Sequence, residues 1–149
     1  MPVAEQQVLQ TLEILREDEI AAPIAIVFET LLEQLGPYNE RPDKVPLAMK
    51  LEAWPGGRWF RDLGNDTGHW WGNVQAIKPP SLLEISGPLF MSYPAISNVQ
   101  YRLSEENGVT QLKFAHRAAG WMPPETTERV HQGWEYIIAQ IRERALGRV

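Results

Sequence analysis

The chain has 149 residues, of which 44% are hydrophobic and 22% are charged, a balance typical of one soluble globular domain. It contains no cysteine, which excludes disulfides, thiolate metal sites and cysteine nucleophiles. Its formal net charge is −5 and its 14 basic residues are scattered, so the basic stripe that binds nucleic acid is missing.

The start of the chain and its apolar runs bear on location. The first ten residues, MPVAEQQVLQ, have neither the basic nor the apolar region of a secretory signal. No apolar run approaches the ~20 residues that a membrane span needs. We therefore expect a single cytoplasmic domain over residues 1–149, with no membrane insertion and no nucleic-acid partner.

The first third of the chain predicts a strand and then a helix. Residues 9–20 alternate imperfectly between apolar and polar, which favours a strand. Pro23 then stands at a favourable first helical position, and apolar residues follow it at spacings of three and four. Gly36 and Pro37 end this helix, and the polar, proline-bearing segment 38–46 predicts a loop.

Antiparallel strands and a long helix are predicted for the rest of the chain. The hairpin signals are the loop 64–68 and the pair Asn107-Gly108, which favours a type I′ turn. A single apolar stripe marks residues 124–146 as a helix. The strands are expected at 47–53, 58–63, 69–78, 82–86, 97–105 and 109–116.

This order of elements predicts an α+β fold. A helix of roughly 22 residues is about 33 Å long, which matches the width of a sheet and can cover its apolar face. We expect a curved antiparallel sheet wrapped around the C-terminal helix, with the short helix closing one end. Gly56-Gly57, within WPGGRWF, would supply a bend or tight turn, and the flanking aromatics would reach the concave face or its rim.

Four local patterns add a family resemblance to this architecture. They are Ala22-Pro23 before the first helix, PGGRW at 55–59, GNVQAIKPP at 72–80 running into LLEI at 82–85, and Gly133-Trp134 in the last helix. Together they resemble the helix-grip START-like superfamily, also called SRPBCC or Bet v-like. More narrowly, residues 11–146 are similar to homologues of the C-terminal domain of the heat shock protein 90 ATPase activator.

The resemblance implies a cavity between the sheet and the long helix that accepts an apolar or amphipathic small molecule, such as a lipid-like compound. The same fold supports transport, sensing and cyclase chemistry, so the fold alone does not choose the function. One departure concerns the aromatic-rich segment that the family commonly carries after the first helix. Residues 36–42 (GPYNERP) stand in that place here.

The six tryptophans allow two interpretations, a ligand cavity lined by aromatics or a large aromatic core that fills the grip. Trp70 and Trp71 are neighbours on a strand, so we expect Trp71 to face inward and Trp70 to face outward, where it could form a homodimer contact. The predicted ligand-binding residues are Met49, Leu51, Trp71, Phe90, Met91, Tyr93, Tyr101, Phe114, His116, Trp134 and Ile138.

Within this set, Phe90, Met91 and Tyr93 lie on a predicted loop that could form a flexible lid or simply pack against the end of the sheet. His116 is the candidate acid or base, since an imidazole can titrate near neutral pH. An inward histidine is, however, more often a hydrogen-bonded core residue. The three histidines have no metal-ligand spacing, so we expect neither a metal nor a cofactor.

Three functional classes remain open at this point. The first is the non-catalytic binding of a hydrophobic or amphipathic small molecule. The second is a protein-interaction module associated with chaperones and the stress response, as the family resemblance suggests. The third is an enzyme of the polyketide cyclase or dehydratase kind.

Overall fold

The structure, a computed structural model, describes residues 8–149. Over these residues, seven antiparallel strands form one sheet in the order β1-β7-β6-β5-β4-β3-β2. The elements are β1 (Gln10–Ile20), α1 (Ile24–Leu35), β2 (Met49–Leu51), β3 (Arg58–Gly64), β4 (Thr67–Lys78), β5 (Leu82–Gly87), β6 (Ala95–Glu106), β7 (Val109–Gly120) and α2 (Thr126–Leu146).

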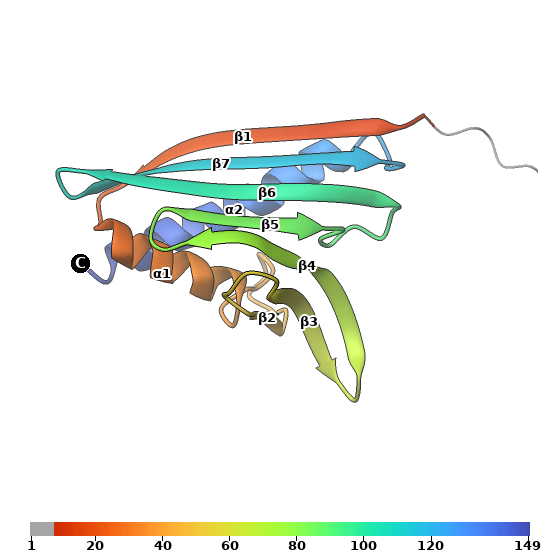
Figure 1. Cartoon of the computed structure of the whole chain (residues 1–149), viewed down its shortest axis with the longest axis horizontal. Helices are drawn as coiled ribbons and strands as arrows, with labels where there is room; N and C mark the ends of the chain where they lie inside the picture. The colour runs from red at the N-terminus through yellow and green to blue at the C-terminus, as the bar shows by residue number, and fades with distance from the viewer. Residues whose placement is uncertain (1–7) are drawn as a thin grey trace, which may run out of the picture.

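The two helices cover the same side of this sheet. Figure 1 shows α2 running behind the strands, with α1 beside the C-terminal part of α2. Arg144 of α2 forms an ion pair with Glu33 of α1 at 2.6 Å, and Arg148, just beyond the end of α2, reaches the same carboxylate at 2.5 Å. This arrangement confirms the predicted helix grip, with a long C-terminal helix held by a curved sheet.

Both predicted hairpins are present, and each closes with a tight turn. Asn107 and Gly108, between β6 and β7, have φ values of 53° and 77°, as a type I′ turn requires. Asn65 and Asp66, between β3 and β4, have φ values of 53° and 57° and make the same kind of turn. These turns fix the register of the two hairpins.

Several strand boundaries differ from the sequence prediction, and the differences in β2 and β7 have a clear physical reason. The strand expected at 47–53 is only Met49–Leu51, because Ala48 takes a left-handed φ of 53° that interrupts extended backbone. The strand expected to end at His116 continues to Gly120, where it pairs with both Gln10 and Ala95. The small residues of this extension carry no alternation from which its length could be predicted.

The segment WPGGRWF is a turn that enters β3. Trp54–Gly57 forms a type II turn, in which Pro55 takes the second position and Gly56 the third, with φ 84°. Gly57 has to be glycine because an added Cβ would lie 1.9 Å from the carbonyl oxygen of Glu52. The two flanking tryptophans have different environments: Trp59 is fully buried, whereas Trp54 is 58% exposed.

The core lies between the sheet and the helices, and its strand residues follow the predicted alternation. Trp71 faces inward and is 7% exposed, whereas its neighbour Trp70 is 48% exposed, as expected. The stripe of α2 is buried through Val130, Trp134, Ile138 and Ile141. Inward strand residues include Met49, Leu83, Ile85, Val99, Tyr101, Leu103, Leu112, Phe114 and His116.

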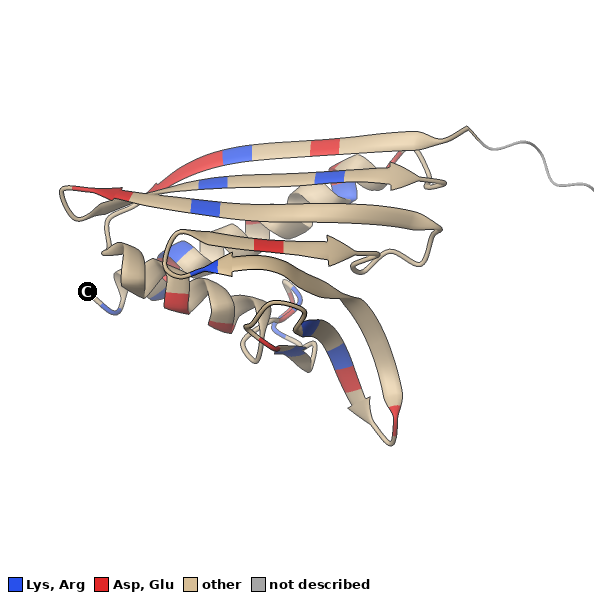
Figure 2. Cartoon of the chain, in the orientation of Figure 1, with Lys and Arg blue, Asp and Glu red and all other residues tan. Residues whose placement is uncertain are grey.

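Acidic and basic side chains are mixed along several strands of the sheet. Figure 2 shows acidic and basic residues interspersed along β1, β6 and β7, with no continuous basic stripe on this side. Several are paired across neighbouring strands, for example Arg117 with Glu13 at 2.9 Å. Within residues 8–149, neither helix is long and apolar enough to cross a membrane.

Candidate ligand cavity

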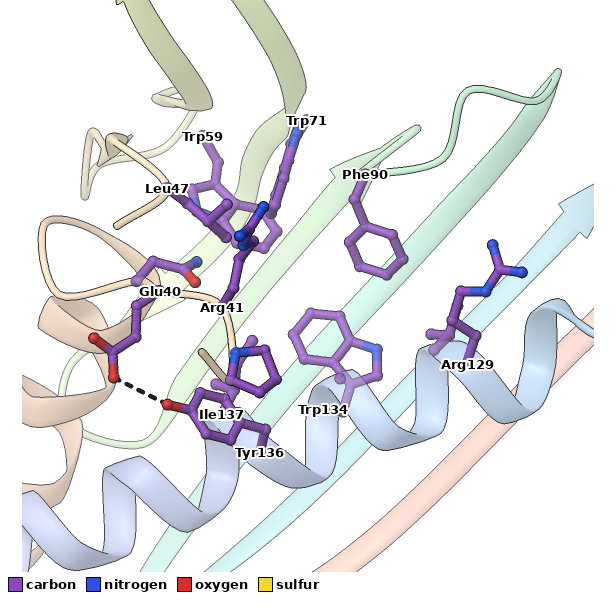
Figure 3. Close-up of a pocket in the computed structure, with 14 residues that line it drawn as sticks. Glu40, Arg41, Leu47, Trp59, Trp71, Phe90, Arg129, Trp134, Tyr136 and Ile137 are labelled. Carbon is purple, nitrogen blue, oxygen red and sulfur yellow. Dashed lines mark hydrogen bonds between the residues drawn. The ribbon is translucent and has the colours of Figure 1, made fainter. Parts of the chain in front are cut away.

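A cavity of about 300 Å³ opens between α2, the β3–β4 pair and the loop that follows α1. Figure 3 shows the side chains that surround it. Its volume is at the lower end of the range for small-molecule sites, which is roughly 300–1,000 Å³. It is lined by Asn39, Glu40, Arg41, Pro42, Leu47, Trp59, Trp71, Phe90, Arg129, Val130, Gly133, Trp134, Tyr136 and Ile137.

Four aromatic rings form a connected wall of this cavity. Trp59 and Trp71 meet edge to face with ring centroids 4.9 Å apart, and Trp71 meets Phe90 in the same way at 5.6 Å. Phe90 in turn lies 6.0 Å from Trp134 of α2. Such edge-to-face and tilted contacts are the favourable geometry for aromatic pairs. The wall therefore spans from the sheet to the long helix.

A bulge in β4 directs Trp71 into this wall. Trp59 pairs with Gly72 and Phe60 pairs with Trp70, so Trp71 is the extra residue between the two pairs. A bulge of this kind bends the strand and redirects the side chain of the unpaired residue. The bend is visible in Figure 1, where β3 and β4 curve away from the rest of the sheet.

Gly133 is an exposed residue at the mouth of the cavity, on the helix side. It lies in the middle of α2, yet an added Cβ there would meet no heavy atom within 4 Å. A glycine inside a helix costs roughly 0.5–1 kcal/mol relative to alanine. Neither close packing nor a positive φ requires glycine at this position, so its visible consequence is the space that it leaves open.

Polar groups stand at two ends of the aromatic wall. At one end, the hydroxyl of Tyr136 donates a hydrogen bond of 2.9 Å to Oε1 of Glu40, and burial together with this bond raises the pKa of Tyr136. At the other end is the guanidinium of Arg129 (Figure 3). Arg41 also lines the cavity, but it binds both carboxylate oxygens of Asp43.

His116 belongs to a buried hydrogen-bond chain rather than to the cavity lining. The indole Nε1 of Trp134 donates to Nδ1 of His116 at 2.9 Å, and Nε2 of His116 lies 3.0 Å from Oγ of Ser97. An indole N–H can only donate, so Nδ1 must accept and the proton must sit on Nε2. Burial lowers the pKa of His116 to about 4. The imidazole is therefore neutral at pH 7.

The structure separates the predicted ligand-binding residues into three groups. Trp71, Phe90 and Trp134 line the cavity. Met91 and Tyr93, with Phe90, line a second hollow of about 270 Å³ beside it. The remaining residues pack in or against the core and do not line the cavity: Met49, Leu51, Tyr101, Phe114, His116 and Ile138.

Among these core residues, Tyr101 has a hydroxyl with no hydrogen-bond partner in the described part of the chain. Burial raises the pKa of Tyr101, so the group stays neutral. A buried hydroxyl without a partner is costly, by roughly 1–3 kcal/mol. The contacts of its ring with Phe114 and Trp134 help to offset that cost.

Several cavity residues were missed by the sequence interpretation. Asn39, Glu40, Arg41 and Pro42 were assigned to a connecting loop, and Gly133 was noted only as part of a family pattern. Trp59 was expected to reach the concave face, but was not assigned to the site.

Across residues 8–149, no group of three or more histidine, aspartate or glutamate side chains is arranged to hold a metal ion.

Comparison with known proteins identifies a family. The model of the family described as Activator of Hsp90 ATPase homolog 1-like protein matches residues 21–145. A comparison with curated proteins finds no significant match.

Solved structures share the fold over nearly the whole chain. CalU16 from Micromonospora echinospora is 22% identical with a TM-score of 0.63, over 94% of this chain and 85% of that chain. An uncharacterised protein from Rhizobium leguminosarum is 18% identical with a TM-score of 0.73, over 95% and 98%. Ara h 8.0201 is 14% identical with a TM-score of 0.68, over 93% and 99%. These structures share the fold of the chain, and the matched family confirms the predicted resemblance to homologues of the heat shock protein 90 ATPase activator.

Proposed function

The chain belongs to the Activator of Hsp90 ATPase homolog 1-like protein family, and we propose that it binds a hydrophobic or amphipathic small molecule without catalysing a reaction. The site would be the cavity between the β3–β4 pair and α2. Its occupant would lie against the aromatic wall formed by Trp59, Trp71, Phe90 and Trp134. Predominantly apolar linings with a few polar groups are typical of small-molecule sites.

The observation that carries this proposal is the open space at Gly133. Trp134 and Ile137 of α2 line the cavity, but Gly133 is exposed and has no heavy atom within 4 Å of its Cβ position, so the cavity stays open on the helix side. The intrinsic cost of a helical glycine is tolerated at a position where a larger side chain would occupy the cavity. We therefore interpret the cavity as a binding site rather than a packing defect.

The environment of His116 favours binding over acid–base catalysis. A general acid or base near pH 7 needs a pKa near that value and access to the substrate. Burial lowers the pKa of His116 to about 4. Its Nδ1 is occupied by Trp134 and its Nε2 by Ser97. We assign it a structural role, and the cyclase or dehydratase interpretation therefore lacks its candidate residue.

Two experiments test the binding proposal. Denaturing mass spectrometry of the purified protein should release a co-purified apolar compound. Separately, the neutral dye N-phenyl-1-naphthylamine should bind wild type with a rise in fluorescence and in melting temperature, since binding to the folded state alone stabilises it. Gly133→Leu should abolish dye binding by filling the space.

Ala139→Leu is the matched control for this substitution, because Ala139 is exposed on the same helix and does not line the cavity. It should bind the dye like wild type. Equal binding by the Gly133→Leu and Ala139→Leu variants would contradict the proposed site. No response of wild type to any apolar compound would contradict the proposed function.

The second candidate is a protein-interaction module of the chaperone-associated kind, which the exposed tryptophans favour. Trp54 is 58% exposed and Trp70 is 48% exposed, and large aromatic residues are enriched at protein interfaces. Trp54→Ser and Trp70→Ser would weaken a partner complex without changing dye binding. The homodimer contact at Trp70, the cytoplasmic location and the stress-response role stay predictions.

A further inference from the structure

Arg129 lacks an electrostatic partner within the fold. Most other arginines bind carboxylates, as Arg142 binds Asp18 at 3.1 Å and Arg144 binds Glu33 at 2.6 Å. Within residues 8–149, Arg129 forms no hydrogen bond or ion pair, although the chain is acidic as a whole. Its side chain is exposed, so the guanidinium is open to an anion from solution.

Arg129 also stands at a position in α2 that does not favour a positive charge. It is the fourth residue of the helix, close to the N-terminal end. That end carries the positive pole of the helix dipole, where an acidic residue is stabilising and a cation is disfavoured. Helix stability therefore gives no reason for an arginine here, and the dipole adds to its attraction for an anion.

Arg129 also borders both hollows of the concave side. It lines the aromatic cavity and the adjoining hollow of about 270 Å³, which it shares with Phe90 and Val130. Hydroxyl-bearing residues line that second hollow as well, namely Ser92, Tyr93 and Thr126. Groups of this kind can donate hydrogen bonds to an anion whose charge is neutralised by a guanidinium.

The charged side chains at the opposite end of the cavity are paired with one another. The carboxylate of Glu40 lies there, accepting the hydrogen bond from Tyr136, and Figure 3 shows Trp134 and Phe90 between this pair and Arg129. Arg41 adds little net charge because Asp43 pairs with it. Glu40 is likewise paired with Lys44, at 3.9 Å, so a negative group on a bound molecule would find an unpaired positive charge only at the Arg129 end.

We infer that the ligand of this cavity is an amphipathic anion whose carboxylate, sulfonate or phosphate group binds Arg129 while its apolar body lies against the aromatic wall. The inference rests on the proposed function. A planar guanidinium can bind such groups through two parallel hydrogen bonds.

A matched pair of dyes separates the headgroup from the apolar body. The dye 8-anilinonaphthalene-1-sulfonate is N-phenyl-1-naphthylamine with one added sulfonate, so the two probes differ only in the negative group. Wild type should bind the sulfonate more tightly, and only the affinity for the sulfonate should fall as salt is raised. Arg129→Gln should weaken sulfonate binding by about tenfold and leave the neutral dye unchanged.

Arg102→Gln is the control, because Arg102 is exposed on β6 between two inward residues and lies outside both hollows. It should leave both affinities unchanged, and equal melting temperatures should show that both variants are folded. If both dyes bind and Arg129→Gln changes them equally or not at all, the headgroup inference is wrong while the proposed function stands. If neither dye binds wild type, the proposed function fails and the inference fails with it.

Discussion

The indole Nε1 of Trp134 donates a hydrogen bond of 2.9 Å to Nδ1 of His116, and this bond joins the wall of the cavity to the buried core. It holds the imidazole in the tautomer with its proton on Nε2, which faces Oγ of Ser97. Protonating Nδ1 would place two N–H groups against each other. Trp134 therefore both lines the cavity and determines the tautomer of His116.

The stability of the fold should depend on pH through His116. The pKa of this side chain falls from 6.5 in the unfolded chain to about 4 in the folded one, because burial disfavours the charged imidazole. Its contribution is complete above pH 6.5 and is lost as pH falls through 4, by roughly 3 kcal/mol in total. Urea unfolding at several pH values should show this loss, and His116→Gln should remove that part of the slope. Identical slopes for the two proteins would contradict the assignment.

Replacing Trp134 by phenylalanine should have two separable effects. At pH 7 the variant should lose about 1–3 kcal/mol, because Nδ1 of His116 is left buried without a donor. Its acid transition should also move to higher pH, since Nδ1 can then accept a proton without displacing an N–H group. Trp54→Phe, at an exposed site, should change stability by less than about 0.5 kcal/mol. A Trp134→Phe variant as stable as wild type would show that the hydrogen bond contributes nothing.

The hairpin between β6 and β7 should depend on Gly108. Its φ of 77° suits glycine, and alanine there should cost on the order of 1 kcal/mol. Gly147→Ala is the control, because Gly147 has a helical φ of −69° that alanine adopts freely. Thermal melts should show destabilisation for Gly108→Ala alone. Equal melting temperatures for the two variants would argue against the type I′ turn.

Two further glycines should respond to alanine in opposite directions. At Gly57 the new Cβ would meet the carbonyl oxygen of Glu52 at 1.9 Å, so the turn must shift and stability should fall by about 2 kcal/mol or more. At Gly133 the Cβ meets nothing within 4 Å, and alanine should stabilise α2 by about 0.5–1 kcal/mol. Chemical unfolding measures both. A destabilised Gly133→Ala variant would contradict the open space described at that position.

Much of the fold was predictable because local patterns and tertiary structure agree. The alternation that turns Tyr101 and Leu103 inward and Arg102 outward follows from strand geometry, and the pair Asn107-Gly108 specifies its turn directly. Trp71 faces inward as predicted, but a bulge in β4 places it there. The shortness of β2 was not predictable in this way. Leu47 to Ala53 alternate like a strand, but the left-handed φ of Ala48 arises from how the loop after α1 joins the sheet.

The cavity was less predictable than the fold because alternation identifies inward residues without showing which of them touch empty space. Tyr101 and Phe114 face the same side as Trp71, yet they are enclosed by their neighbours in the middle of the grip. The residues from Asn39 to Pro42 reach the cavity only because the chain folds back over α2. That approach leaves no periodic signal in the sequence.

The most direct test of the binding site is a titration followed by NMR, because indole N–H signals of the tryptophans report on different surfaces. Trp59, Trp71 and Trp134 line the cavity, whereas Trp54 and Trp70 are exposed and do not. Adding N-phenyl-1-naphthylamine to ¹⁵N-labelled protein should shift the indole signals of the first three and leave the other two in place. Shifts confined to Trp54 and Trp70, or no shifts while the dye is in excess, would contradict a ligand cavity between the sheet and α2.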